Sequence, residues 1–205
     1  SSCLSNIKQL MMGCISYAQD YDEQLPYEDL DINGSGSEDA GDMSWRSMIL
    51  PYCKNVQIFQ CPSNKTAYCG YGHNHCNLGY NGSVSMSRVA KPSETVLLCD
   101  TGLITNPTAA PNDWREDGTG QYYGRWPNNV PYWDTDPRRA VPRHNGLCNT
   151  GFLDGHAEYK ATDTRGWCGL GWSAINPNWA KTVDYTPPIY YGQPVGGVAK
   201  NCNPP

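Results

Sequence analysis

The spacing of apolar residues predicts a long helix at the start of the chain, over residues 3–21. Apolar side chains recur there at steps of three and four, at Leu4, Ile7, Met11, Cys14, Ile15 and Ala18. This spacing gathers them on one helix face. We therefore expect Leu4, Ile7, Met11 and Ile15 to be buried, and Lys8 and Gln9 to face solvent. Pro26 follows, as is common beyond a helix end.

The next part of the chain has weaker patterns. Residues 27–42 are polar and rich in Gly, Ser and acidic residues, which is typical of a loop. Ser44 is a candidate N-cap for a short helix that Pro51 ends. Residues 56–60 fit a short strand, and the Cys-, Gly- and Asn-rich residues 61–92 are predicted to be loops.

Two segments further along predict an antiparallel sheet. Residues 95–99, TVLLC, are short, apolar and rich in β-branched side chains, as buried strands are. Residues 147–153 and 156–161 flank Asp154-Gly155, a preferred two-residue hairpin turn. Residues 102–145, dense in Pro, Gly, Asn and Trp, are expected to leave the sheet as an ordered excursion.

These elements predict an α+β fold in one domain over residues 1–205: an N-terminal amphipathic helix packed on a small antiparallel sheet with long loops. Within it we distinguish a helix, a helix-to-sheet loop region, a sheet with the hairpin, and a C-terminal extension, at residues 1–22, 23–92, 93–161 and 162–205.

Composition narrows the range of functions. The net charge is −5, which argues against a nucleic-acid binder, because that function needs a basic face. Gly (21) and Pro (16) are numerous, which indicates a loop-rich chain, and the 7 Trp and 14 Tyr argue against disorder. No stretch reaches the roughly 18 apolar residues of a membrane helix.

Ten cysteines favour an oxidising compartment and several disulfides. Reduced thiols and a zinc site are the alternatives, but zinc sites usually contain C-x₂₋₄-C pairs and this chain has none. We expect at least three disulfides. One closes residues 61–76, one ties Cys202 to the body through Cys168, and Cys3 is the cysteine expected to stay unpaired.

Several phrases carry a resemblance to a known family. They are CLSNIKQLMMGCISYAQDYDEQLP (3–26), CPS (61–63), KPSETVLLCDT (91–101) and RHNGLCNTGFLDGHAE (143–158). In the last phrase, nine residues separate His144 from Asp154-Gly155. The chain resembles the H-X9-DG "prepilin-type processing-associated" proteins, which look like major pseudopilins of type II secretion.

That resemblance implies a pilin-like fold and a non-catalytic structural subunit. It implies partners in the other pseudopilin subunits of a fibre, and an inner-membrane anchor through an upstream hydrophobic half-helix that this sequence lacks. The location would be the periplasm or the cell surface. The alternative is a cell-surface carbohydrate-binding module with a pilin-type anchor, because exposed rings in the aromatic run 114–133 would stack on the sugars of a polysaccharide.

The sequence offers little support for an enzyme. It contains no G-x-S-x-G, no H-E-x-x-H and no Walker-type phosphate loop. A cysteine nucleophile paired with His144 is conceivable, but ten cysteines favour structural pairing instead. We therefore expect no catalytic activity.

An acidic loop is a candidate calcium site. Its oxygen ligands have a spacing close to that of a calcium-binding loop with Gly36 at the turn, and they are Asp31, Asn33, Ser35, Asp39 and Asp42. Asp42 is shorter than the usual glutamate, and Glu38 stands where an apolar residue normally packs. The alternative is a solvated acidic turn.

The hairpin offers a second metal candidate, made of His144, Asp154, His156 and Asp100, which suits a transition metal. A straight strand, at about 3.3 Å per residue, would hold His144 away from Asp154. We therefore rank the H-X9-DG residues His144, Asp154 and Gly155 as structural first. His73 and His75 are expected in a solvated loop.

Overall fold

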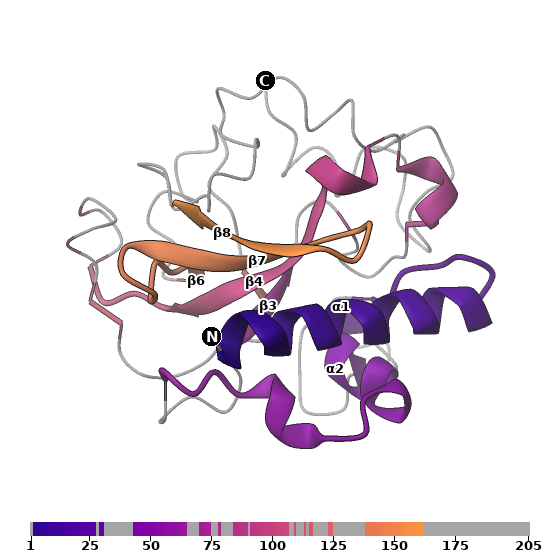
Figure 1. Cartoon of the computed structure of the whole chain (residues 1–205), viewed down its shortest axis with the longest axis horizontal. Coiled ribbons are helices and arrows are strands. Elements are labelled where there is room, and N and C mark those ends of the chain that lie inside the picture. Colours follow the sequence, from indigo (N-terminus) through magenta and orange to yellow (C-terminus); the bar gives the residue numbers. More distant parts are fainter. Residues whose placement is uncertain are drawn as a thin grey trace.

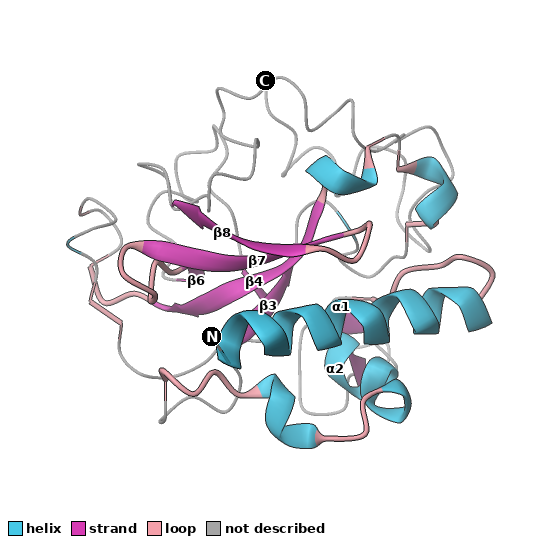
Figure 2. Cartoon of the chain, viewed as in Figure 1, coloured by secondary structure: helices cyan, strands magenta, loops and turns pink. Residues whose placement is uncertain are grey.

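The computed structural model describes residues 2–27, 29–30, 43–64, 70–74, 78, 84–89, 91–106, 109, 113, 115–116, 123–124 and 138–161. The α-helices are α1 (Ser2–Asp20) and α2 (Trp45–Ile49), and the 3₁₀ helices are η1 (Leu50–Tyr52), η2 (Val56–Phe59), η3 (Met86–Arg88) and η4 (Pro92–Glu94). The strands are β1 (Asp29–Leu30), β2 (Met43–Ser44), β3 (Tyr71–Asn74), β4 (Val96–Leu103), β5 (Tyr123–Gly124), β6 (Arg138–Ala140), β7 (Leu147–Phe152) and β8 (Ala157–Ala161). Figure 2 shows their distribution.

The main sheet has the order β5-β3-β4-β7-β8, and β6 pairs with the last three residues of β4. The strand pairs β3–β4, β4–β7 and β7–β8 are antiparallel, whereas β5 runs parallel to β3. Strands β1 and β2 form a separate antiparallel pair. The predicted α+β class, with a helix and a small antiparallel sheet, is confirmed.

Helix α1 lies between two layers. The sheet covers one side and the segment with α2 and η2 covers the other, as Figure 1 shows. Ile7 and Met11 are buried while Lys8 and Gln9 are exposed, as expected. The predicted stripe is nevertheless rotated, because two layers cover the helix. Its buried residues are Cys3, Ile7, Leu10, Met11, Gly13, Cys14, Tyr17 and Ala18, whereas Leu4 and Ile15 are only half-buried.

The sheet approaches α1 closely at Gly151 on β7. A Cβ atom there would lie 2.5 Å from Met11 Cγ and 2.9 Å from Ile7 Cγ2. The absence of a side chain therefore lets the strand rest directly on the helix.

The β7–β8 hairpin forms as predicted, but its turn differs. Phe152 N donates to His156 O at 2.9 Å, and Gly155 N donates to Phe152 O at 2.8 Å. Three residues, Leu153 to Gly155, therefore form the loop instead of two. Only Gly155 has a positive φ, of 91°, as in a three-residue loop that ends in a left-handed residue.

Two predicted elements are wrong. Residues 56–60 were expected as a strand, but η2 is a 3₁₀ helix whose first turn is capped by Asn55 Oδ1, which accepts from Gln57 N at 2.9 Å. Strand β3 lies within residues 61–92, which were expected to be loops. Its sequence, YGHN, has no apolar pattern, and pairing with β4 decides its conformation.

Other expectations agree better. The TVLLC strand forms, and β4 continues to Leu103. Helix α2 begins after Ser44, although that side chain makes no capping hydrogen bond. Among the described residues, none of the helices is long and apolar enough to cross a bilayer.

Candidate functional site

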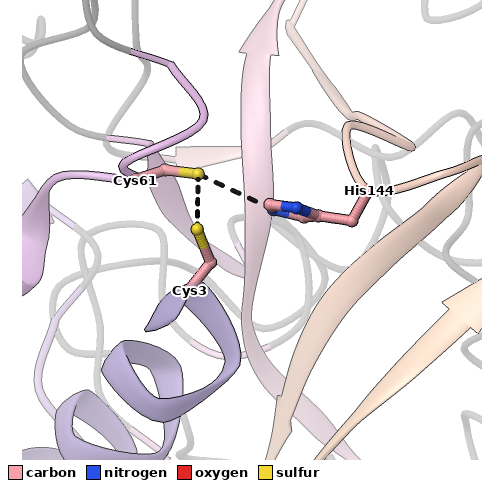
Figure 3. Close-up of side chains that lie close together, drawn as sticks. All are labelled: Cys3, Cys61 and His144. Carbon is pink, nitrogen blue, oxygen red and sulfur yellow. Dashed lines mark hydrogen bonds between the residues drawn. The ribbon is translucent and has the colours of Figure 1, made fainter. Parts of the chain in front are cut away.

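Three side chains from distant parts of the sequence converge beside the sheet. Cys3 lies in the first turn of α1, Cys61 follows η2, and His144 precedes β7 (Figure 3). Their sulfur and nitrogen atoms all lie within 4.8 Å of one another. Cys61 Sγ is 3.2 Å from Cys3 Sγ and 3.7 Å from His144 Nε2.

A tight turn places His144. Asn145 and Gly146 have φ values of 54° and 78°, and His144 and Leu147 exchange backbone hydrogen bonds of 2.9 and 3.0 Å. Two successive positive φ angles define a type I′ hairpin turn, for which Asn-Gly is a favoured sequence. The turn fixes His144 at the start of β7, where its ring reaches Cys61.

A buried charged cluster lies behind the histidine. Asp100 on β4 is fully buried, and its Oδ2 accepts hydrogen bonds from Asn149 N at 2.6 Å and Asn149 Nδ2 at 2.8 Å. The same oxygen is 3.4 Å from His144 Nε2. Arg143 Nη1 lies 3.6 Å from Asp100 Oδ1.

Arg143 joins this cluster to a second carboxylate. Its guanidinium pairs with Glu116 and donates to the carbonyl oxygens of Gly70 at 3.2 Å and Thr101 at 2.8 Å. Burial alone would lower the pKa of Arg143, but the hydrogen bond to Glu116 and the charge of Asp100 raise it overall. The guanidinium therefore stays charged and links β3, β4 and the Glu116 region.

The arrangement does not suit nucleophilic catalysis by Cys61. Burial, and then the nearby charge of Asp100, raise the pKa of Cys61 to about 12, so the thiol stays protonated at neutral pH. In a catalytic Cys-His pair one ring nitrogen faces the thiol and the other faces an orienting group. Here Cys61 and Asp100 both face Nε2 of His144.

Two thiols and an imidazole are also a donor set for zinc or copper(I). This trio is the one such group found within the described residues. In a tetrahedral zinc site, two sulfurs each about 2.3 Å from the metal lie about 3.8 Å apart. The separation of 3.2 Å between Cys3 Sγ and Cys61 Sγ is shorter than that, and longer than a disulfide bond of about 2.0 Å.

The hairpin metal candidate separates into two pairs. His144 contacts Asp100 at the start of β7, whereas Asp154 and His156 lie beyond its end. Asp154 Oδ1 accepts from His156 N at 3.1 Å and contacts Nδ1 of the same residue at 2.5 Å. Burial raises the pKa of Asp154, but the hydrogen bonds from the backbone and the ring of His156 together lower it overall. Asp154 therefore stabilises the turn, and the predicted four-residue site does not form.

Other predicted positions have mixed outcomes. His73 was expected in a solvated loop, but it is fully buried on β3, with its ring centroid 6.5 Å from that of Trp45. The calcium candidates Asp31, Asn33, Ser35, Asp39 and Asp42 lie outside the described residues, as do His75, Cys76, Cys168 and Cys202. Of the aromatic run 114–133, only residues 115–116 and 123–124 are described.

The cysteine expectations change most. Cys61 was expected to close residues 61–76, but it is a free thiol. Cys3, which was expected to stay unpaired, is a free thiol as well and lies beside Cys61. Cys14, Cys53 and Cys99 are also buried thiols, while Cys148 is in a disulfide. Sequence reasoning also missed Arg143 and Glu116, because no local pattern marks two residues that meet only through the sheet.

A groove of about 490 Å³ runs beside α1, apart from His144 and Asp100. Its lining includes Lys8 and Met12 from the helix and Tyr52 and Cys53 from the facing segment.

In comparisons with known protein families, curated proteins and solved structures, no match to this chain was found.

Proposed function

We propose that this chain is the globular part of a pseudopilin-like structural subunit, in a type II secretion or type IV pilus-like assembly at the cell surface. The role is assembly and not catalysis. An upstream hydrophobic helix anchors the precursor in the inner membrane, and neighbouring pseudopilin subunits are its partners in the fibre. Mature subunits are then periplasmic or extracellular.

The observation that carries this proposal is the way α1 lies on the sheet. The helix has 19 residues, packs on one side against β7, β8 and β4 and on the other against α2 and η2, and leaves Lys8, Gln9 and Met12 exposed. A helix attached along its length to an antiparallel sheet transmits force from an upstream helix to the whole globular part. That is the mechanical requirement for a fibre subunit.

The H-X9-DG residues support the same view, because each has a structural role. His144 joins the charged cluster at one end of β7, and Asp154 and Gly155 form the turn at the other end. The motif therefore marks both ends of the strand that lies on α1. Calcium binding by residues 31–42 stays a separate proposal.

The test begins with the gene that encodes this chain. We expect a short basic leader and a cleavage site upstream of Ser1, followed by about 20 apolar residues that are long enough to span a bilayer. The precursor is then expressed with a pilus-type machine, and sheared fibres are examined by immunoblot and electron microscopy. A matched precursor with an uncleavable leader is the control and should yield no labelled fibre.

Other results would contradict the proposal. A start codon directly before Ser1 would rule out the anchor. Retention of the chain on insoluble polysaccharide, lost on competition with soluble sugar, would favour the carbohydrate-binding alternative. The subunit proposal predicts that the chain passes through such a column unretained.

A further inference from the structure

We propose that two disulfides, Cys3–Cys61 and Cys14–Cys53, fasten α1 to the segment that runs along it. Neither pair follows from the cysteine spacing, and the first replaces the expected bridge within residues 61–76. The inference rests on thiol positions alone and does not depend on the proposed function.

The first pair is nearly in bonding position. Cys3 Sγ and Cys61 Sγ lie 3.2 Å apart, about 1.2 Å more than a disulfide bond of about 2.0 Å. Both residues are buried, with 1% and 0% of their surface exposed. A small rotation of the two side chains is enough to form the bond.

The second pair lies further along the same helix. Cys53 Sγ lies 2.8 Å from where a Cβ atom of Gly13 would stand, so its sulfur touches the helix backbone next to Cys14. Both thiols are buried. Cys14 directly follows Gly13 in the helix, so Cys53 is the described thiol that lies beside it.

The two pairs agree with a single arrangement of the chain. Cys3 and Cys14 are 11 residues apart on α1, which corresponds to about 16 Å at 1.5 Å per residue. Residues 53–61 run beside the helix in the opposite direction, and η2 between them contacts α1. A single antiparallel alignment of this segment with α1 therefore places Cys53 beside Cys14 and Cys61 beside Cys3.

A metal shared by Cys3, Cys61 and His144 fits less well. The sulfur separation of 3.2 Å lies between about 2.0 Å for a disulfide and about 3.8 Å for two sulfurs on one zinc, so metal content is measured in the test below. Nε2 of His144 faces the carboxylate of Asp100 as well, and that carboxylate pairs with Arg143.

Each bond forms by thiol–disulfide exchange with a disulfide-bearing oxidant. One cysteine thiolate attacks the oxidant and forms a mixed disulfide, and the second thiolate displaces the oxidant's other sulfur. Two S–H bonds break, one S–S bond forms, and the two electrons reduce the oxidant's disulfide to two thiols. Oxidised glutathione serves as this oxidant in the test, and exchange takes place before folding buries the sulfurs.

Digestion with trypsin can identify both disulfide pairs. Trypsin cleaves after Lys8, Arg46, Lys54 and Lys65, which places each of the four cysteines in its own peptide. The protein is refolded in a glutathione redox buffer, alkylated in denaturant, digested without reduction and examined by mass spectrometry. We expect peptide 1–8 linked to 55–65, and peptide 9–46 linked to 47–54. Reduction should release all four.

Two single variants serve as controls, because each should remove one disulfide and leave the other intact. Cys3→Ser should abolish only the link between 1–8 and 55–65, and Cys14→Ser only the link between 9–46 and 47–54. Because the wild-type map is complete by itself, it decides the matter even where a variant fails to fold.

Three results would overturn the inference. The first is alkylation of all four cysteines in the oxidised, folded protein. The second is a different pairing, such as 47–54 with 55–65 or 55–65 with 66–88. The third is stoichiometric zinc or copper in the purified protein that is lost in both Cys3→Ser and His144→Ala.

Discussion

Arg143 is a buried cation that pairs with a buried carboxylate. Its side chain is 6% exposed and is the cationic partner of Asp100, whose own side chain is fully buried. Removing one partner of a buried ion pair leaves the other charge without compensation. The residue therefore stabilises the junction of β3 and β4 through charge as well as through hydrogen bonds.

We predict that Arg143→Met lowers the free energy of unfolding by about 3–5 kcal/mol, because the buried carboxylate of Asp100 loses its partner. Urea unfolding measures the change. Lys91→Met is the matched control, since it removes the exposed ion pair with Glu94 and should cost no more than about 1 kcal/mol. If Arg143→Met and Lys91→Met lowered the free energy of unfolding equally, the buried ion pair would stabilise the fold no more than the exposed one.

Gly151 is important for a different reason, because it leaves space for side chains of α1. We predict that Gly151→Ala destabilises the protein by about 1–3 kcal/mol, because its Cβ atom would overlap Met11 and Ile7. Combining it with Met11→Ala frees the space, so the double variant should cost less than the sum of the single variants. Strict additivity in thermal unfolding would indicate that strand and helix do not touch here.

At the scale of elements, α1 derives its stability from the layers on its two sides. We predict that Ile7→Ala lowers the free energy of unfolding by about 2–5 kcal/mol, because the side chain is completely buried. Lys8→Ala on the exposed face should change it by less than about 0.5 kcal/mol. Chemical denaturation of both variants tests the assigned faces, and a large loss with Lys8→Ala would mean that the helix is rotated.

The whole molecule should respond differently to alkaline pH when it is reduced and when it is oxidised. Burial raises the pKa of Cys53 to about 11 and of Cys61 to about 12 from an ordinary value of 9.0. The folded reduced protein therefore holds these protons more tightly than the unfolded chain does. Its stability is fully present below pH 9 and falls as pH rises from there toward 11–12.

In the oxidised protein these sulfurs no longer titrate, so that loss should be absent. Urea midpoints measured from about pH 8 to pH 10.5 in both forms provide the comparison, and Lys and Tyr ionisation is common to both. Parallel curves would show that oxidation leaves Cys53 and Cys61 as thiols.

The sequence by itself determined the elements whose pattern is local. The three- and four-residue spacing around Ile7 and Met11 predicted α1, TVLLC predicted β4, and Asp154-Gly155 predicted the hairpin. Each is dictated by the preference of a few consecutive residues for one backbone conformation and one buried face.

Only the tertiary structure decided the rest. Strand β3 has no pattern of its own and forms because β4 offers it hydrogen bonds. Leu10 and Tyr17 replace Leu4 and Ile15 on the buried face of α1 because two layers cover the helix. The meeting of Cys3 with Cys61, 58 positions away, has the same origin: residues distant in sequence become neighbours only through packing, which no local spacing encodes.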